Sequence, residues 1–147
     1  MSPKLYFWQM ESGKKLKVEA LIEAPLAEVW KKWTEATHVV NWNFAHESWH
    51  CPHAEVDFQV GGTSTYRMEA KDGSFGFDLI ARFLAIQDQR FIQSELEDGR
   101  AVEVYFEEAG AACKLVQYFE PETENPLELQ QGGWQAILNH FKQYCEQ

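Results

Sequence analysis

The sequence predicts an α+β fold in which antiparallel strands pack against one long C-terminal helix. Three observations carry this prediction. An alternating apolar pattern occupies 15–23, about six strand patterns separated by short turns lie between 56 and 119, and one long helical pattern closes the chain. The strands need a cover for their apolar face, and only the last helix is long enough to provide it.

The first part of the chain predicts one strand and two short helices. Apolar and charged residues alternate over 15–23, as they do in a half-buried strand. Pro25 suits the first position of a helix, and apolar residues follow it at helical spacing as far as Trp33. Thr37 can cap a second short helix.

The middle of the chain predicts strands joined by glycine-containing turns. We expect a loop over 43–55, which contains Pro52, and strands only beyond it. The first of these covers 56–60 and ends at Gly61-Gly62, a turn or bulge signal. The strand over 75–86 is apolar on both faces, so the pattern does not determine which face is buried.

The C-terminal helix has a clear start signal. We expect Asn125 as the N-cap and Pro126 at the first helical position, with Glu128 completing a capping box. Apolar side chains then recur at spacings of three and four as far as Cys145, which predicts one buried stripe.

The charge balance disfavours polyanionic partners. Thirteen basic and 23 acidic residues give a net charge of −10, and the whole excess lies in 51–147. An acidic domain repels phosphate backbones and anionic lipid headgroups, so we expect neither nucleic-acid binding nor electrostatic membrane docking. We expect the carboxylates at turns, such as Glu122 and Glu124, to be solvated.

The length and the cysteines indicate one cytoplasmic domain. A chain of 147 residues suits a single domain over 1–147, with an N-terminal extension over 1–13, and can build a core without disulfides or a metal. We expect neither a signal peptide nor a membrane span, because no long apolar run is present. Three widely spaced cysteines without a CxxC motif indicate reduced thiols.

One segment concentrates residues that could carry chemistry, namely His46, His50, Cys51 and His53. These are zinc-ligand types, and a histidine near a cysteine can lower a thiol pKa for nucleophilic catalysis. The spacing H-x3-H-C-x-H is not a standard metal motif, and adjacent side chains of an extended segment point to opposite sides. We therefore interpret the segment as a loop packed by Trp42, Phe44 and Trp49, forming an outer cluster separate from the inward-facing rings.

The aromatic content leaves one question open. Six Trp, ten Phe and five Tyr make up 14% of the chain, which excludes disorder. At helical and strand spacings such rings fill a core by default. Whether they fill a solid core or line a hollow one stays open at this point.

The order of elements and several motifs resemble the START-related, birch-pollen-allergen-like superfamily called SRPBCC. The resemblance is to the branch of the heat-shock-protein-90 ATPase activator homologues and covers about 15–145. The residues that carry it are Ala24-Pro25…Val29-Trp30…Trp33, Trp42-Asn43-Phe44, Trp49-His50-Cys51-Pro52, Asp57…Val60-Gly61-Gly62, Met68 to Asp78, Phe119-Glu120-Pro121-Glu122 and Gln130…Gly133 to Leu138. This sequence has Ala81 where family members often have a glycine, at the bend of a long strand.

The resemblance implies a helix-grip fold, in which a curved antiparallel sheet wraps the long C-terminal helix around a hydrophobic cavity. It implies a cytoplasmic protein that holds a lipid, sterol or polyketide-like molecule there, with a cyclase-type enzyme or a stress- or chaperone-associated interaction module as alternatives. We assign no catalytic residue, metal ligand or cofactor. The candidate ligand-binding residues are Trp30, Trp33, Phe58, Tyr66, Met68, Phe77, Phe106, Gln130, Trp134, Ile137, Leu138 and Phe141.

Overall fold

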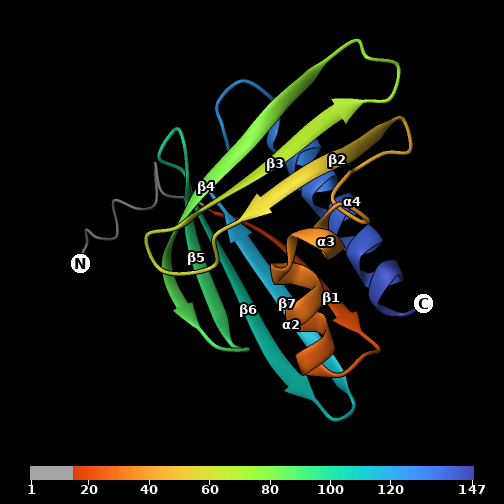
Figure 1. Cartoon of the computed structure of the whole chain (residues 1–147), viewed down its shortest axis with the longest axis vertical. Coiled ribbons are helices and arrows are strands. Elements are labelled where there is room, and N and C mark those ends of the chain that lie inside the picture. The colour runs from red at the N-terminus through yellow and green to blue at the C-terminus, as the bar shows by residue number, and fades with distance from the viewer. Residues whose placement is uncertain (1–14) are drawn as a thin grey trace.

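A computed structural model describes residues 15–147 (Figure 1). The expected extension over 1–13 lies outside the described residues. The elements follow the predicted order of strand, two short helices, strands and one long helix. They are β1 (Leu16–Ile22), α2 (Leu26–Thr34), α3 (Ala36–Val39), β2 (Trp49–Val56), β3 (Thr63–Ala70), β4 (Gly76–Gln87), β5 (Phe91–Leu96), β6 (Ala101–Ala109), β7 (Ala112–Phe119) and α4 (Leu127–Cys145).

The strands form one antiparallel sheet of seven strands in the order β1-β7-β6-β5-β4-β3-β2. Figure 1 shows that this sheet is strongly curved. Buried residues of all three helices join strand residues in one core cluster, so the helices cover the same face of the sheet. The predicted α+β helix-grip fold, with two short helices after the first strand, is confirmed. No helix in the described part of the chain is long and apolar enough to cross a membrane.

Polar side chains of α4 fasten the helix along the edge of the sheet at β1. Gln131 Nε2 donates to the Lys17 carbonyl at 2.8 Å, and Lys142 Nζ donates to the Leu21 carbonyl at 2.7 Å. Between them, the Gln135 side chain donates to the Glu19 carbonyl and accepts from its N–H. An edge strand leaves backbone groups unpaired, so these contacts satisfy the edge and fix the position of α4.

A β-bulge explains why the pattern of β4 is apolar on both faces. The register with β5 shifts between Phe83 and Ala85, so Leu84 is an extra residue and is 41% exposed. Phe83 is buried before the bulge, and Ile86 packs against the core after it. The inward face therefore changes from odd to even numbers within one strand, because a bulge reverses the alternation.

Two predictions near the edge strand β2 are wrong. The segment predicted as a loop over 43–55 contains most of β2, because Pro52 is tolerated at a register shift in an edge strand. The predicted strand over 56–60 does not form. Val56 is instead the last residue of β2, and a turn follows it. Gly62 is required in that turn, because a Cβ atom there would lie 2.2 Å from the Asp57 carbonyl oxygen.

Both predicted helix caps are also wrong. Pro126 is the N-cap of α4 and makes no side-chain cap bond, whereas Asn125 donates its side-chain amide to Glu122. The N-cap of α3 is Glu35, so Thr37 lies inside that helix. In both cases the candidate cap residue lies one or two positions from the cap.

Candidate ligand-binding cavity

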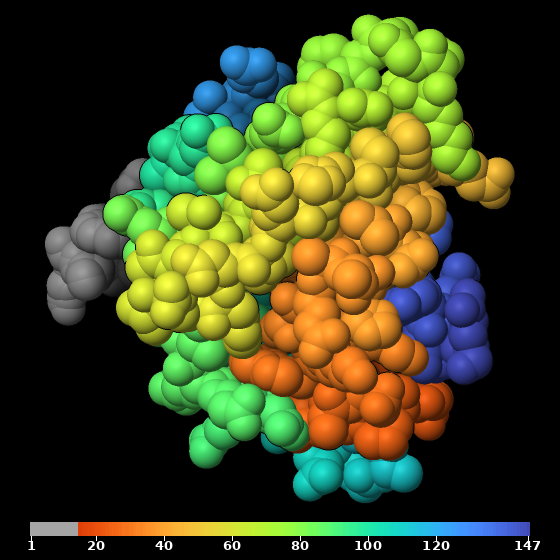
Figure 2. Space-filling view, viewed as in Figure 1, coloured from red at the N-terminus to blue at the C-terminus, as the bar shows by residue number. Residues whose placement is uncertain are grey.

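A cavity of about 350 Å³ lies between the strands β2–β7 and the first half of α4. This volume is at the lower end of small-molecule pockets, which span roughly 300–1,000 Å³. Apolar and aromatic side chains make up most of the wall. On the face seen in Figure 2, the atoms of α2, α3 and β2 pack together over the interior.

The structure brings eight of the twelve candidate residues to this cavity and leaves four elsewhere. The residues that line it are Trp33, Phe58, Tyr66, Met68, Phe77, Gln130, Trp134 and Ile137. The residues that do not are Trp30, Phe106, Leu138 and Phe141, all of which are buried in the core. Whether any lining residue binds a ligand stays a prediction.

The four remaining candidates contact other core residues and do not face the cavity. The ring of Trp30 packs edge-on against Phe58 and Phe106, with centroids 5.7 and 4.9 Å apart. Leu138 and Phe141 belong to the second half of α4. There the ring of Phe141 packs edge-on against the ring of Trp33, with centroids 4.9 Å apart. One apolar stripe therefore serves two purposes, because its first half faces the cavity and its second half fills the core.

The interpretation of Trp42 as part of an outer cluster is wrong. Trp42 is 3% exposed, stacks on Trp33 with ring centroids 5.0 Å apart, and lines the cavity. Its indole N–H donates to the Lys32 carbonyl at 3.0 Å. The other two rings lie apart, Phe44 against His140 and Trp49 against Phe75 and Phe77.

Sequence reasoning also missed the strand residues of the cavity wall. They share the inward face of their strands, and the alternation within each strand is the signal that could have found them. They are Val56, Ser64, Leu79, Ala81, Phe83, Ile92, Ser94, Leu96, Val102, Val104 and Gln117. Asn43 is a further lining residue, in the segment after α3, and no periodic signal marks it.

The polar groups on the β2–β3 side of the cavity stay neutral. Burial raises the pKa of Tyr66 to about 12, against a weaker lowering by its hydrogen bond with Ser64. Burial also raises the pKa of the nearby Cys51 thiol, which donates to the His53 carbonyl at 3.5 Å. Asn43 is 5% exposed, and its Nδ2 has no hydrogen-bond partner among residues 15–147.

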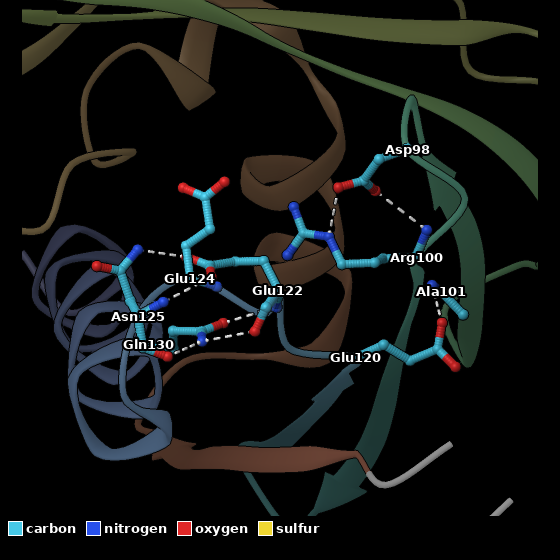
Figure 3. Close-up of polar contacts among 8 residues, drawn as sticks. All are labelled: Asp98, Arg100, Ala101, Glu120, Glu122, Glu124, Asn125 and Gln130. Atoms are coloured by element: carbon cyan, nitrogen blue, oxygen red, sulfur yellow. Dashed lines mark hydrogen bonds and ion pairs between the residues drawn. The ribbon is translucent and has the colours of Figure 1, made fainter. Parts of the chain in front are cut away.

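The Gln130 carboxamide is committed to the protein backbone. Its Oε1 accepts from the Glu122 N–H at 2.9 Å, and its Nε2 donates to the carbonyls of Glu122 at 3.0 Å and Asn125 at 2.8 Å (Figure 3). All three contacts reach the segment between β7 and α4. Gln130 therefore holds this segment in place and has little capacity left for a ligand.

The charged side chains of the cavity wall, Arg100 and Glu122, are both compensated by neighbours. Arg100 Nε donates to Asp98 Oδ2 at 2.7 Å. The Glu122 carboxylate accepts from the backbone N–H groups of Glu124 at 2.6 Å and Asn125 at 2.9 Å, and from the Asn125 side chain (Figure 3). The bond from the Asn125 side chain is the main reason why the pKa of Glu122 lies below its usual value. Glu122 is thus hydrogen-bonded within the loop, and these bonds lie at an exposed position.

The side chains of His46, His50, Cys51 and His53 do not point toward one common position. His50 Nε2 lies 3.7 Å from Glu69 Oε1, and His53 Nε2 lies 3.0 Å from Glu55 Oε2. His46 bonds Ser48 at 2.8 Å. Within residues 15–147, no three His, Cys, Asp or Glu side chains are grouped as metal ligands.

Comparison with known proteins adds the family context. Comparison with curated proteins finds no match. The solution structure of an AHSA1-like protein from Aeromonas hydrophila is similar, with 36% identity, a TM-score of 0.84, and coverage of 89% of this chain and 91% of that one. The solution structure of Chr148 from Cytophaga hutchinsonii has 43% identity and a TM-score of 0.78, with coverage of 88% and 90%.

A more distant likeness concerns the fold alone. The crystal structure of protein CV1439 from Chromobacterium violaceum has 18% identity and a TM-score of 0.81, and the alignment covers 91% of this chain and 99% of that one.

The family model described as activator of Hsp90 ATPase homolog 1-like protein matches residues 23–146. The chain therefore belongs to the family of activator of Hsp90 ATPase homolog 1-like proteins, a branch of the SRPBCC superfamily.

Proposed function

We propose that this protein is a cytoplasmic binding protein that holds one small apolar molecule between the sheet and α4. The observation that carries the proposal is the cavity of about 350 Å³, whose wall is mostly aliphatic and aromatic. Transfer of an apolar molecule from water into such a wall is favourable by about 25 cal/mol for each Å² buried.

The cavity volume narrows the class of ligand. A volume of about 350 Å³ lies within the range of pockets that hold small molecules, roughly 300–1,000 Å³. This space suits a compact aromatic or polyketide-like molecule, or part of one lipid chain.

The chemistry of the wall favours binding over a cyclase-type reaction. General acid–base catalysis is most effective when the pKa of the catalytic group lies near the working pH. Tyr66, with a pKa of about 12, stays protonated, and the lowered pKa of Glu122 keeps it ionised and bonded within its loop. The Arg100 side chain is paired with Asp98.

A ligand screen with two matched variants tests the proposal. The panel contains single-chain fatty alcohols, sterols and flavonoid-like aromatics, and the readouts are the melting temperature and the indole resonance of Trp134. Ala81→Leu places a larger side chain in the cavity wall, and Ala109→Leu makes the same change at an exposed position of β6.

We expect at least one class of compound to raise the melting temperature and shift the Trp134 resonance, since ligands that bind only the native state stabilise it. Ala81→Leu should weaken both responses, and Ala109→Leu should leave them unchanged. If no compound moves either signal in the unsubstituted protein, the proposal fails.

A further inference from the structure

The Asn43 carboxamide is a polar group in the cavity wall that the protein does not match. Its backbone N–H is satisfied by the Val39 carbonyl at 3.1 Å, which fixes the residue after α3. Its side-chain Nδ2 is buried and has no partner in the described part of the chain. Buried donors are hydrogen-bonded in the great majority of cases, and an unpaired one costs free energy, so this group calls for an acceptor.

The neighbouring groups do not supply that acceptor. The Cys51 thiol does interact with the Asn43 side chain, and this interaction lowers the pKa of the thiol, but burial has the larger effect, raises that pKa and keeps the thiol protonated. A protonated thiol is a weak acceptor, and this one donates to the His53 carbonyl. The Tyr66 and Ser64 hydroxyls interact with each other, which lowers the pKa of Tyr66 against the larger effect of burial, and neither hydroxyl pairs with Asn43 Nδ2.

The charges of the cavity indicate that the missing acceptor is neutral. Arg100, the cation of the described wall, already pairs with Asp98 and lies near the Glu122 carboxylate. An anionic ligand group beside Asn43 would enter an apolar wall without a cation to balance it, and burial of an unpaired charge is strongly unfavourable. A carbonyl oxygen accepts the bond without a charge.

We propose that the ligand is a neutral carbonyl compound, such as a ketone, ester or lactone, whose oxygen accepts a hydrogen bond from Asn43 Nδ2. This inference rests on the proposed function and specifies the chemical class of its ligand. Asn43 is then the residue that orients the molecule, while the apolar wall supplies the affinity.

A pair of probes with one skeleton isolates this bond. 9-Fluorenone and fluorene share the same rings and differ in a carbonyl against a methylene group. Their dissociation constants are measured by two-dimensional NMR titration in the unsubstituted protein, in Asn43→Leu and in the control Asn41→Ala. Asn41 is an exposed asparagine two residues away, bonded to the Thr37 carbonyl at 3.0 Å.

The quantity that decides is the affinity of the ketone divided by that of the hydrocarbon. Comparing this ratio between variants cancels the different hydrophobicity of the two probes. We expect Asn43→Leu to lower the ratio about tenfold, as the loss of one buried hydrogen bond predicts, and Asn41→Ala to leave it unchanged. An equal ratio in the unsubstituted protein and in Asn43→Leu overturns the inference and leaves the proposed function intact.

A second measurement needs no variant. The side-chain NH₂ resonances of Asn43 should move on addition of fluorenone and stay in place with fluorene, and this result decides the matter if Asn43→Leu does not fold. Equal shifts with both probes would contradict the proposed bond. If fluorene or compounds of the ligand screen bind and fluorenone does not, the inference alone is overturned, and if nothing binds, both proposals fall.

Discussion

Replacement of Gln130 tests how the loop at the entrance to α4 is held. Gln130 is 8% exposed, and its carboxamide bonds three backbone groups of Glu122 and Asn125. Gln130→Met keeps a side chain of similar length and removes all three bonds. At about 1 kcal/mol for each lost bond, we expect the free energy of unfolding to fall by about 3 kcal/mol.

The control is Gln131→Ala, which removes one bond from an exposed side chain to the Lys17 carbonyl. We expect this variant to lose about 1 kcal/mol or less. The assay is urea unfolding followed by circular dichroism, with thermal melting as a check. For a chain of this size, 3 kcal/mol corresponds to a decrease of about 10 °C in melting temperature. If Gln130→Met lowers the free energy of unfolding no more than Gln131→Ala does, the hydrogen bonds of Gln130 do not stabilise this loop as we infer.

Two further predictions concern the bulge in β4 and the carboxylate of the loop. Phe83→Ala should cost about 3 kcal/mol in urea unfolding, because it removes a buried ring, whereas Leu84→Ala should cost less than 1 kcal/mol because Leu84 points outward at the bulge. Equal costs would place the bulge elsewhere. Because the pKa of Glu122 is lower in the folded than in the unfolded chain, its contribution to stability is present above its unfolded pKa and is lost as the pH falls through the folded value. Glu122→Gln should therefore reduce stability at pH 7 and flatten the decline of stability below about pH 4.5, and an unchanged acid limb in urea unfolding at several pH values would contradict this.

The fold was predictable because its evidence is local and repeated. Alternation over 15–23 and the stripe of α4 each report one buried face, and the order of elements then favours a sheet with a covering helix. The β4 pattern was ambiguous because a bulge depends on pairing with β5, which lies outside the strand itself. The strand β2 was missed because an edge position tolerates Pro52, and edge positions are not visible in a single segment.

The cavity was predictable only in part, because inward orientation does not distinguish a core from a hollow. Trp134 and Phe141 lie on one stripe of α4, yet the first faces the cavity and the second packs against Trp33 and Trp42. The difference depends on which strands lie opposite each turn of the helix, a property of the tertiary structure. Asn43 was invisible for a related reason, since its burial follows from the path of the chain after α3.

The supports of α4 explain why the cavity does not close by collapse of the helix onto the sheet. The rings of Trp33 and Trp42 pack against Phe141 on the second half of α4, with centroids 4.9 and 4.7 Å apart. At the other end, the three bonds of Gln130 anchor the first turn to the loop after β7. Between these two supports the edge contacts to β1 fix the lateral position of the helix. Close-packed interiors normally fill such space, so a helix held at both ends and along one edge indicates a cavity that the fold maintains rather than a fault in its packing.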